Sequence, residues 1–458
     1  MAEVLNRVIE KAIRGSAPAQ INVPRDYWTQ VIDIELPPIV RLERQGGGAD
    51  AISKAAELLS NANFPVILSG AGVVIGGAIE ETKKLAEKLD SPVCSGYQHN
   101  DSFPGSHPLA VGPLGYNGSK AAMELISKAD VVLALGTRLN PFSTLPGYGI
   151  DYWPKNANII QVDINPDRIG LTKKVTVGIS GDAKLVAKQI LDKLSPSAGD
   201  IDRQKRKDLI HQTKSAWLQK LSSLDHEDDD EGTVWNKEAR ERDADRMSPR
   251  QAWRAIQSGM PEDVIISSDI GNNCAIGNAY PTFEKPRKYL APGLFGPCGY
   301  GFPSILGAKI GCPDTPVIGF AGDGAFGISM NEMSSCAREE WPAITMVIFR
   351  NYQWGAEKRN TTLWFDNNFI GTELDPELSY AKVADACGLK GVTVRSMEET
   401  TAAIKQSCED QKKGITTFIE VILNQELGEP FRRDAMKKPV RVAGVKKEDM
   451  KKQPSLNS

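Results

Sequence analysis

Two polar residues follow two apolar runs of the chain, and together they could bind a cation. The run 317–321 is followed by Asp323 within a Gly-Asp-Gly sequence, and the run 344–349 is followed by Asn351. A carboxylate, an amide oxygen and a backbone carbonyl from the next turn form the hard oxygen set that Mg²⁺ prefers, with room for diphosphate oxygens and water. Gly-Asp-Gly alone is equally typical of an ordinary turn. The apolar runs before both residues favour the cation site.

The elements around these residues predict a strand, a helix and a second strand. Short apolar runs that end at glycines are typical of buried parallel strands. Between them, residues 330–340 have helical spacing, and Pro342 precedes the second run. In a right-handed crossover both strands end at the same edge of the sheet, which is where open α/β sheets bind ligands. We therefore expect Asp323 and Asn351 to lie close together.

This segment resembles the signature of the thiamin-diphosphate-dependent enzymes, which include acetolactate synthase and pyruvate decarboxylase. In that family a Gly-Asp-Gly is followed, after one crossover, by Asn-Asn. The resemblance implies thiamin diphosphate and Mg²⁺ as cofactors, with Mg²⁺ held by Asp323, Asn351 and the backbone carbonyl of Gln353. The first Asn of the pair is Arg350 in this chain. This difference removes no Mg²⁺ ligand, but it places the positive charge of the Arg350 side chain near the diphosphate.

Two further loops complete the cofactor site that the resemblance implies. The glycine at the position of Gly296 accepts a hydrogen bond from the aminopyrimidine in the family, and a bulky residue at the position of Cys298 wedges the cofactor into its bent shape. Cysteine is a smaller wedge, and Cys298 is equally well explained as a core thiol. The expected cofactor-binding residues are Gly271, Asn272, Gly296, Cys298, Gly322, Asp323, Gly324, Ala325, Asn351, Gln353, Trp354 and Gly355.

Two segments, 350–360 and 426–433, resemble the acyltransferase branch of this family that acts on sulfoacetaldehyde. The implied reaction converts sulfoacetaldehyde and phosphate to acetyl phosphate and sulfite through a thiamin-diphosphate carbanion. Both substrates are anions and require cationic partners; the candidates are Lys358, Arg359, Arg350 and Arg432. An acetolactate-synthase-like carboligase or a 2-oxo acid decarboxylase is the alternative enzyme. A non-catalytic nucleotide-binding or assembly subunit is the alternative of another class.

The order of elements predicts an α/β fold with two complete Rossmann-like parallel-sheet domains and the remnant of a third. Helix 4–13 and strand 20–23 resemble the end of the family's pyrimidine-binding domain, which carries the activating glutamate. No carboxylate of this chain takes that role from the motif, so we expect weak Mg²⁺-diphosphate binding without turnover, and a homodimer or homotetramer only for a complete protein. The expected segments are the remnant 1–38, a central domain 39–199, a charged linker 200–247, a diphosphate and Mg²⁺ domain 248–425, and a tail 426–458.

In the central domain, helices 49–62 and 79–89 alternate with strands 65–68, 131–135 and 158–162. Its glycine turn 70–76 has one residue more than the dinucleotide fingerprint. It is therefore predicted either as a scaffold turn or as a nucleotide site. The last domain is expected to begin with a helix capped by Ser248 and Pro249, followed by strand 264–267, and to end with strand 416–422.

Composition excludes several classes of protein. The chain has 458 residues, a net charge of -3 and a pI near 6.0. An acidic surface gains no electrostatic binding energy from nucleic acid or an anionic membrane, so we expect neither as a partner. No apolar stretch suits a bilayer or a signal peptide, so we expect a cytoplasmic protein. Seven scattered cysteines indicate reduced thiols, and the four histidines do not cluster, which disfavours a zinc site.

Overall fold

The computed structural model describes residues 2–15, 17–35, 43–195, 203–226, 237–293, 295–338, 340–365 and 367–427. The chain divides into two compact units. Unit 1 comprises 1–144, 152–221 and 281–289, and unit 2 comprises 145–151, 222–280 and 290–458. The domain boundaries expected from the sequence stay predictions.

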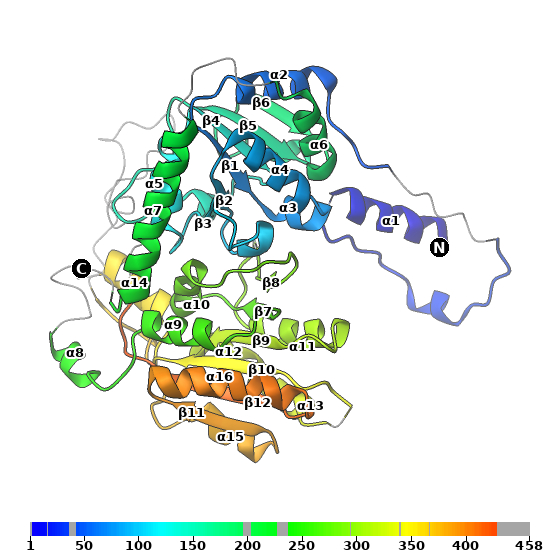
Figure 1. Ribbon diagram of the computed structural model, residues 1–458. Helices are drawn as coiled ribbons and strands as arrows, with labels where there is room; N and C mark the ends of the chain where they lie inside the picture. Colours follow the sequence, from blue (N-terminus) through cyan, green and yellow to red (C-terminus); the bar gives the residue numbers. More distant parts are fainter. Residues whose placement is uncertain are drawn as a thin grey trace, which may run out of the picture. The chain divides into compact units, whose positions relative to one another are not determined.

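Unit 1 contains a six-stranded sheet in the order β3-β2-β1-β4-β5-β6, with every neighbouring pair parallel (Figure 1). Every residue of β1 and β4 is buried, so both faces of the sheet are covered. The strands are β1 (Pro65–Ser69), β2 (Val93–Ser95), β3 (Ala110–Pro113), β4 (Val131–Leu135), β5 (Asn158–Asp163) and β6 (Val177–Ser180). The helices are α2 (Ala49–Ser60), α3 (Ala71–Gly76), α4 (Ile79–Leu89), α5 (Lys120–Ile126), α6 (Ala183–Lys193) and α7 (Arg203–Ser223), the last of which ends two residues beyond the unit.

Unit 2 contains a second six-stranded sheet in the order β11-β12-β10-β9-β7-β8 (Figure 1). Its strands are β7 (Ile265–Ser268), β8 (Tyr289–Leu290), β9 (Val317–Gly322), β10 (Thr345–Arg350), β11 (Lys390–Val394) and β12 (Thr417–Ile422). Its helices are α8 (Lys237–Arg242), α9 (Pro249–Gly259), α10 (Asn272–Ile276), α11 (Gly301–Gly311), α12 (Asp323–Ser329), α13 (Met333–Cys336), α14 (Gly355–Trp364), α15 (Tyr380–Ala386) and α16 (Met397–Gln411). The pairs β7–β9, β9–β10, β10–β12 and β11–β12 are parallel, which confirms the predicted α/β class.

Helix α9 shows how local sequence positions the second sheet. Ser248 accepts a hydrogen bond from the backbone N–H of Gln251, whose side chain accepts one from the Ser248 N–H, and Pro249 occupies the first turn. The fully buried Trp253 packs against Phe320 of β9 and Phe349 of β10, with ring centroids 4.7 and 5.3 Å away. The helix is thereby fixed against the two strands that end at Gly322 and Arg350.

Three local predictions are wrong. Residues 20–23 form no strand, because they have no neighbouring strand to pair with in the part of the chain that the structure describes. The helix predicted over 330–340 begins earlier: α12 starts at Asp323, and a 3-10 turn at Met330–Glu332 leads into the short α13. The glycine turn 70–76 is largely helix α3. In the last two cases the helix begins directly after a strand, where apolar periodicity gives no signal.

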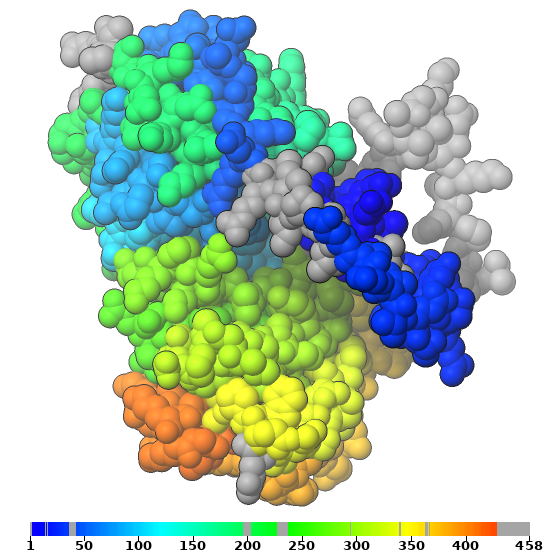
Figure 2. All heavy atoms as spheres, turned by 90° about the vertical axis from the view of Figure 1, so that its right-hand side faces the viewer, coloured from blue at the N-terminus to red at the C-terminus, as the bar shows by residue number. Residues whose placement is uncertain are grey.

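The N-terminal segment is helix α1 (Ala2–Gly15) and a 3-10 turn at Arg25–Thr29. Its apolar side chains are exposed, among them Ile13 at 68% and Trp28 at 74%, and it belongs to the blue atoms of Figure 2. Pro37 and Pro38, at the end of the expected remnant 1–38, lie outside the described residues. The remaining 3-10 turns are Asn100–Ser102, Pro141–Thr144, Pro166–Arg168 and Gly277–Ala279.

Candidate functional site

The strand register of unit 2 brings the predicted cation ligands together. β9 and β10 pair in parallel with Gly322 opposite Phe349, so Asp323 and Asn351 both follow the carboxyl ends of adjacent strands. Their side chains approach to 3.3 Å. The sequence prediction that a crossover would join these residues at one edge of the sheet is therefore confirmed.

Three oxygen atoms converge at this edge. With its amide in one orientation, the side-chain oxygen of Asn351 lies 3.3 Å from Oδ1 of Asp323 and 3.2 Å from the carbonyl oxygen of Gln353. Such an arrangement is repulsive by itself. Adjacent oxygens around octahedral Mg²⁺ lie about 3 Å apart, because each is about 2.1 Å from the metal. The spacing and chemistry of the three atoms fit a bound Mg²⁺.

The Asn351 amide also has an opposite orientation that suits the metal-free protein. After a half-turn its nitrogen donates to the same two oxygens, and its oxygen accepts from Nδ2 of Asn273 at 3.2 Å. Oxygen and nitrogen of an amide occupy the same positions in the two cases, so the surroundings decide between them. A cation would select the first orientation.

Asp323 is the charged member of this group and is completely buried. Its Oδ1 accepts from the N–H of Gly324 at 2.9 Å, and its Oδ2 accepts from the N–H of Tyr352 at 2.7 Å and from Nη1 of Arg350 at 3.0 Å. Burial raises the pKa of Asp323 to about 6, although the Arg350 guanidinium offsets part of that increase. A cation with two positive charges would favour the ionised carboxylate.

Asp269 organises the neighbouring loops and was missed as a site residue in the sequence. This buried carboxylate follows β7 and accepts hydrogen bonds from the backbone N–H groups of Ile270, Gly299 and Gly301 at 2.7 to 3.1 Å. Burial raises its pKa, and these N–H groups lower it in part. Asp269 thus joins the loop that begins at Gly271 to the loop that contains Gly296. Like Asp323, Asp269 directly follows a strand, and this position could have identified it as a site residue from the sequence.

Glycine is present at different positions of the site for different physical reasons. A Cβ on Gly324 would lie 2.8 Å from the indole of Trp354, so glycine is required there for packing. A Cβ on Gly322 would meet no atom within 4 Å, and the position is sterically open. Gly271 and Gly296 have φ of 118° and 61°, which favours glycine.

The remaining predicted cofactor residues lie in the same part of unit 2. Asn272 donates from Nδ2 to the carbonyl of Leu427 at 3.0 Å, and Ala325 is buried in α12. Gly355 begins α14, directly after Trp354. Cys298 is only partly buried, which weakens its interpretation as a core thiol, and its burial raises its pKa.

The predicted anion-binding residues are engaged with the protein itself. Lys358 forms an ion pair with Glu373 and lies 5.3 Å from the ring centroid of Phe369. Arg359 donates to the carbonyl of Leu427. Arg350 is buried behind Asp323, and Arg432 lies outside the described residues. Lys358 and Arg359 lie on α14, which follows the predicted cation ligands Asn351 and Gln353 in the chain. Both therefore stay candidates for binding an anionic substrate.

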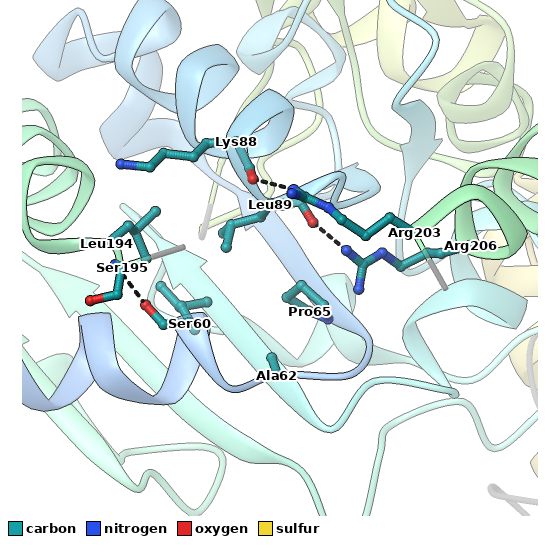
Figure 3. Close-up of a pocket in the computed structure, with 10 residues that line it drawn as sticks. Ser60, Ala62, Pro65, Lys88, Leu89, Leu194, Ser195, Arg203 and Arg206 are labelled. Carbon is teal, nitrogen blue, oxygen red and sulfur yellow. Dashed lines mark hydrogen bonds between the residues drawn. The ribbon is translucent and has the colours of Figure 1, made fainter. Parts of the chain in front are cut away.

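The cavity shown in Figure 3 belongs to unit 1, and none of these residues lines it. It measures about 300 Å³ and is lined by the carboxyl-terminal ends of α2, α4 and α6 and by Arg203 and Arg206. Arg206 donates to the carbonyl of Leu89 at 2.6 Å, and Arg203 donates to that of Lys88. Cations commonly bind the last carbonyls of helices. The arginines are therefore explained as helix caps, near Pro65 at the edge where β1 begins.

Metal binding through cysteine or histidine finds no support in the described ranges. All seven cysteines are free, and no group of three or more His, Cys, Asp or Glu residues there could hold a metal ion. Within the same residues, no helix has the length and apolar character needed to cross a membrane.

Comparison with known proteins assigns the class. A family model of the central domain of thiamine pyrophosphate enzymes matches residues 52–190, and one of their C-terminal TPP binding domain matches residues 269–421. The chain belongs to the thiamine pyrophosphate enzymes, and thiamin diphosphate is its cofactor.

Individual relatives narrow the similarity within this class. The chain is 78% identical over 451 residues to the probable sulfoacetaldehyde acetyltransferase of Rhizobium meliloti (strain 1021), an alignment that covers 98% of this chain and 76% of the relative. It is 72% identical over 453 residues to the sulfoacetaldehyde acetyltransferase of Roseovarius nubinhibens, covering 99% and 75%. A probable acetolactate synthase large subunit of Methanocaldococcus jannaschii is 30% identical over 419 residues, covering 88% and 67%.

Proposed function

We propose that this chain uses Mg²⁺ and thiamin diphosphate to convert sulfoacetaldehyde and phosphate to acetyl phosphate and sulfite. The observation that carries the cofactor part is the convergence of oxygens from Asp323, Asn351 and Gln353 at one edge of the sheet. The substrate part is supported by the 78% and 72% identity to acetyltransferases named for sulfoacetaldehyde, against 30% to an acetolactate synthase.

The role of this chain's own residues is to bind the cofactor and to orient it. When bound, thiamin diphosphate supplies the nucleophilic carbon and the electron sink of the reaction. Oδ1 of Asp323, the Asn351 amide oxygen and the Gln353 carbonyl would hold Mg²⁺ and, through it, the diphosphate. Gly271, Asn272, Gly322 and the residues after Asp323 would line the same place. The loop around Gly296, held by Asp269, would face the pyrimidine of the cofactor, as the family resemblance implies.

The two anionic substrates require positive charge in a site with little water. Lys358 and Arg359 are mostly buried and lie on the first two turns of α14, after Gln353. Arg359 donates to the carbonyl of Leu427, so a substrate anion would share or replace that acceptor. We assign phosphate or sulfonate binding to these two residues. Arg350 is not assigned to an anion, because its guanidinium already binds Asp323 and the carbonyls of Asp375 and Leu378.

The test measures cofactor binding and product formation separately. Purified protein is titrated with thiamin diphosphate and Mg²⁺, with titration calorimetry as the readout, and is then incubated with sulfoacetaldehyde and phosphate or with pyruvate. Sulfite and acetyl phosphate in equal amounts support the proposal. Carbon dioxide from pyruvate without sulfite from sulfoacetaldehyde would instead support a carboligase or decarboxylase.

Binding without either reaction would favour the third hypothesis, a non-catalytic subunit. Cofactor binding is the more direct measure of the site, because it depends on the residues that converge at the edge of the sheet. The assembly state, expected to be a homodimer or homotetramer for a complete protein, is measured by sedimentation of the same sample.

A further inference from the structure

A buried ion pair lies directly behind the Asp323 carboxylate. Arg350 has no exposed surface, and its Nη1 binds Oδ2 of Asp323, which also accepts the N–H of Tyr352. The other terminal nitrogen of the guanidinium donates to the carbonyls of Leu378, at 3.0 Å, and Asp375. The guanidinium is therefore held on both sides, and it turns Oδ1 of Asp323 toward Asn351.

Glu420 is the second carboxylate of this group. It lies on β12, is 2% exposed, and places Oε1 3.7 Å from Nε of Arg350. Its other contacts are donors: the hydroxyl of Ser379 at 2.7 Å, the N–H of Tyr380 at 3.2 Å and the hydroxyl of Thr393 at 3.3 Å. Among the described residues, Glu420 forms no hydrogen bond with Asp323, Asn351 or Gln353, whose oxygens converge at the edge of the sheet.

The charges of the group explain why both residues are present. Arg350 alone would neutralise Asp323 and leave the converging oxygens with no net charge to attract a cation. Glu420 adds one negative charge, so the group of two carboxylates and one guanidinium keeps a net charge of about -1. That is the charge Asp323 would have next to a neutral residue, such as the Asn that the family signature has at the position of Arg350.

We propose that Arg350 and Glu420 are positioning residues for the Mg²⁺ site: Arg350 orients Asp323, and Glu420 cancels the charge of Arg350, so that cation affinity depends on both although neither touches the cation. This inference rests on the proposed Mg²⁺ site. It goes beyond that site because it assigns a function to two residues that do not touch the cation, one of which stands where the family signature has a neutral Asn.

A double-mutant cycle tests the pair, with Mn²⁺ as the probe and its electron paramagnetic resonance signal as the readout, without substrate. Glu420→Gln leaves the charge of Arg350 uncancelled and should weaken Mn²⁺ binding roughly tenfold. Adding Arg350→Asn to that variant should restore the affinity to within about threefold of the original protein. A merely structural pair would make the double variant bind more weakly than Glu420→Gln.

Asp410→Asn is the matched control. Asp410 is also a buried carboxylate of unit 2 with a cationic partner, Lys390, but that pair lies where β11 begins, at the opposite edge of the sheet. This variant should lose stability in thermal unfolding without losing Mn²⁺ affinity.

The outcomes separate this inference from the proposed function. If the original protein binds no Mn²⁺, the metal site itself is refuted. If it binds Mn²⁺ and Glu420→Gln binds equally well, the metal site stands and the positioning role is overturned. Should Glu420→Gln fail to fold, the double variant decides alone: a folded double variant that binds more than tenfold more weakly contradicts the proposal.

Discussion

The carboxyl edges of the two sheets are built from similar turns and differ in what meets there. After β1, the N–H of Gly70 donates to the carbonyl of Leu135 at 3.0 Å and that of Gly72 donates to the carbonyl of Gly136 at 2.8 Å. A Cβ on Gly72 would lie 2.6 Å from the Cα of Gly136. The edge of unit 1 is thus closed by backbone against backbone at this turn.

The corresponding edge of unit 2 is open at Gly322, and side-chain oxygens converge beside it. A glycine-rich turn after a strand therefore has two uses, close packing of the fold or close approach of a ligand. The two are distinguished by whether the N–H groups are already donated and by what a Cβ would meet. This contrast leads to four predictions.

The largest effect is expected from Asp323→Asn. Removing the only charged member of the converging oxygens should weaken Mg²⁺ and Mn²⁺ binding by about 100-fold or more, since a carboxylate is the strongest of the three ligands. Asp163→Asn is the control, because Asp163 ends β5 of unit 1 and should leave cation binding unchanged. Equal losses in the two variants would break the contrast between the edges.

The two glycines should respond oppositely to alanine. Gly72→Ala inserts a methyl group against the backbone of Gly136 and should lower the free energy of unfolding by about 2–3 kcal/mol, as overpacking does. Gly322→Ala should leave the unfolding temperature nearly unchanged but weaken thiamin diphosphate binding roughly tenfold, because the methyl group takes the space of the ligand. Denaturant unfolding and cofactor titration of both variants measure the difference. A stable Gly72→Ala protein would show that the first turn is not closed.

Cation binding should depend on pH in the range set by Asp323. Its pKa is raised by burial to about 6, so below that pH a proton occupies the carboxylate and competes with the cation. Mn²⁺ affinity should be constant above about pH 7 and fall about tenfold for each pH unit below 6. Affinity that stays constant down to pH 5 would mean that the carboxylate titrates at its ordinary value.

The smallest effect is expected from Lys358→Gln. Phosphate binding to the cofactor-loaded protein, measured by titration calorimetry, should weaken about threefold to fivefold, because one of two cationic partners is lost. Thiamin diphosphate binding should be unaffected. The exposed Lys382 on α15 provides the control, as Lys382→Gln should change neither affinity.

The sequence predicted buried strands and amphipathic helices more reliably than helices that begin directly after a strand. The bounds of β4 and of α4 agree with the predicted 131–135 and 79–89, because buried apolar runs and amphipathic repeats are local signals. The start of α12 was missed, since Asp323 and Gly324 look like a turn until the crossover packs them. Which atoms converge depends on strand register, and register is a property of two segments rather than one.

For the candidate site, the sequence identified the residues but not their supports. Glu420 is one charged residue within the apolar strand Thr417–Ile422, and a charge at such a position is a signal for a buried partner. Its partner, Arg350, was named only as a possible anion ligand. The contact between them joins the adjacent strands β10 and β12, and the two residues are seventy positions apart in the sequence. Spacing alone could therefore not have revealed it.

The pairing of β9 with β10 also limits how this protein could change during evolution. Arg350 and Asn351 are neighbours in the chain and do unlike work, one behind the Asp323 carboxylate and the other in front of it. Because successive side chains of a strand point to opposite faces, losing or gaining one residue within β10 would turn Arg350 away from Asp323 and displace Asn351, which directly follows the strand. Insertions and deletions should therefore accumulate in exposed connections that hold none of these residues, such as 312–314, while the length of β10 stays the same among descendants that keep the activity.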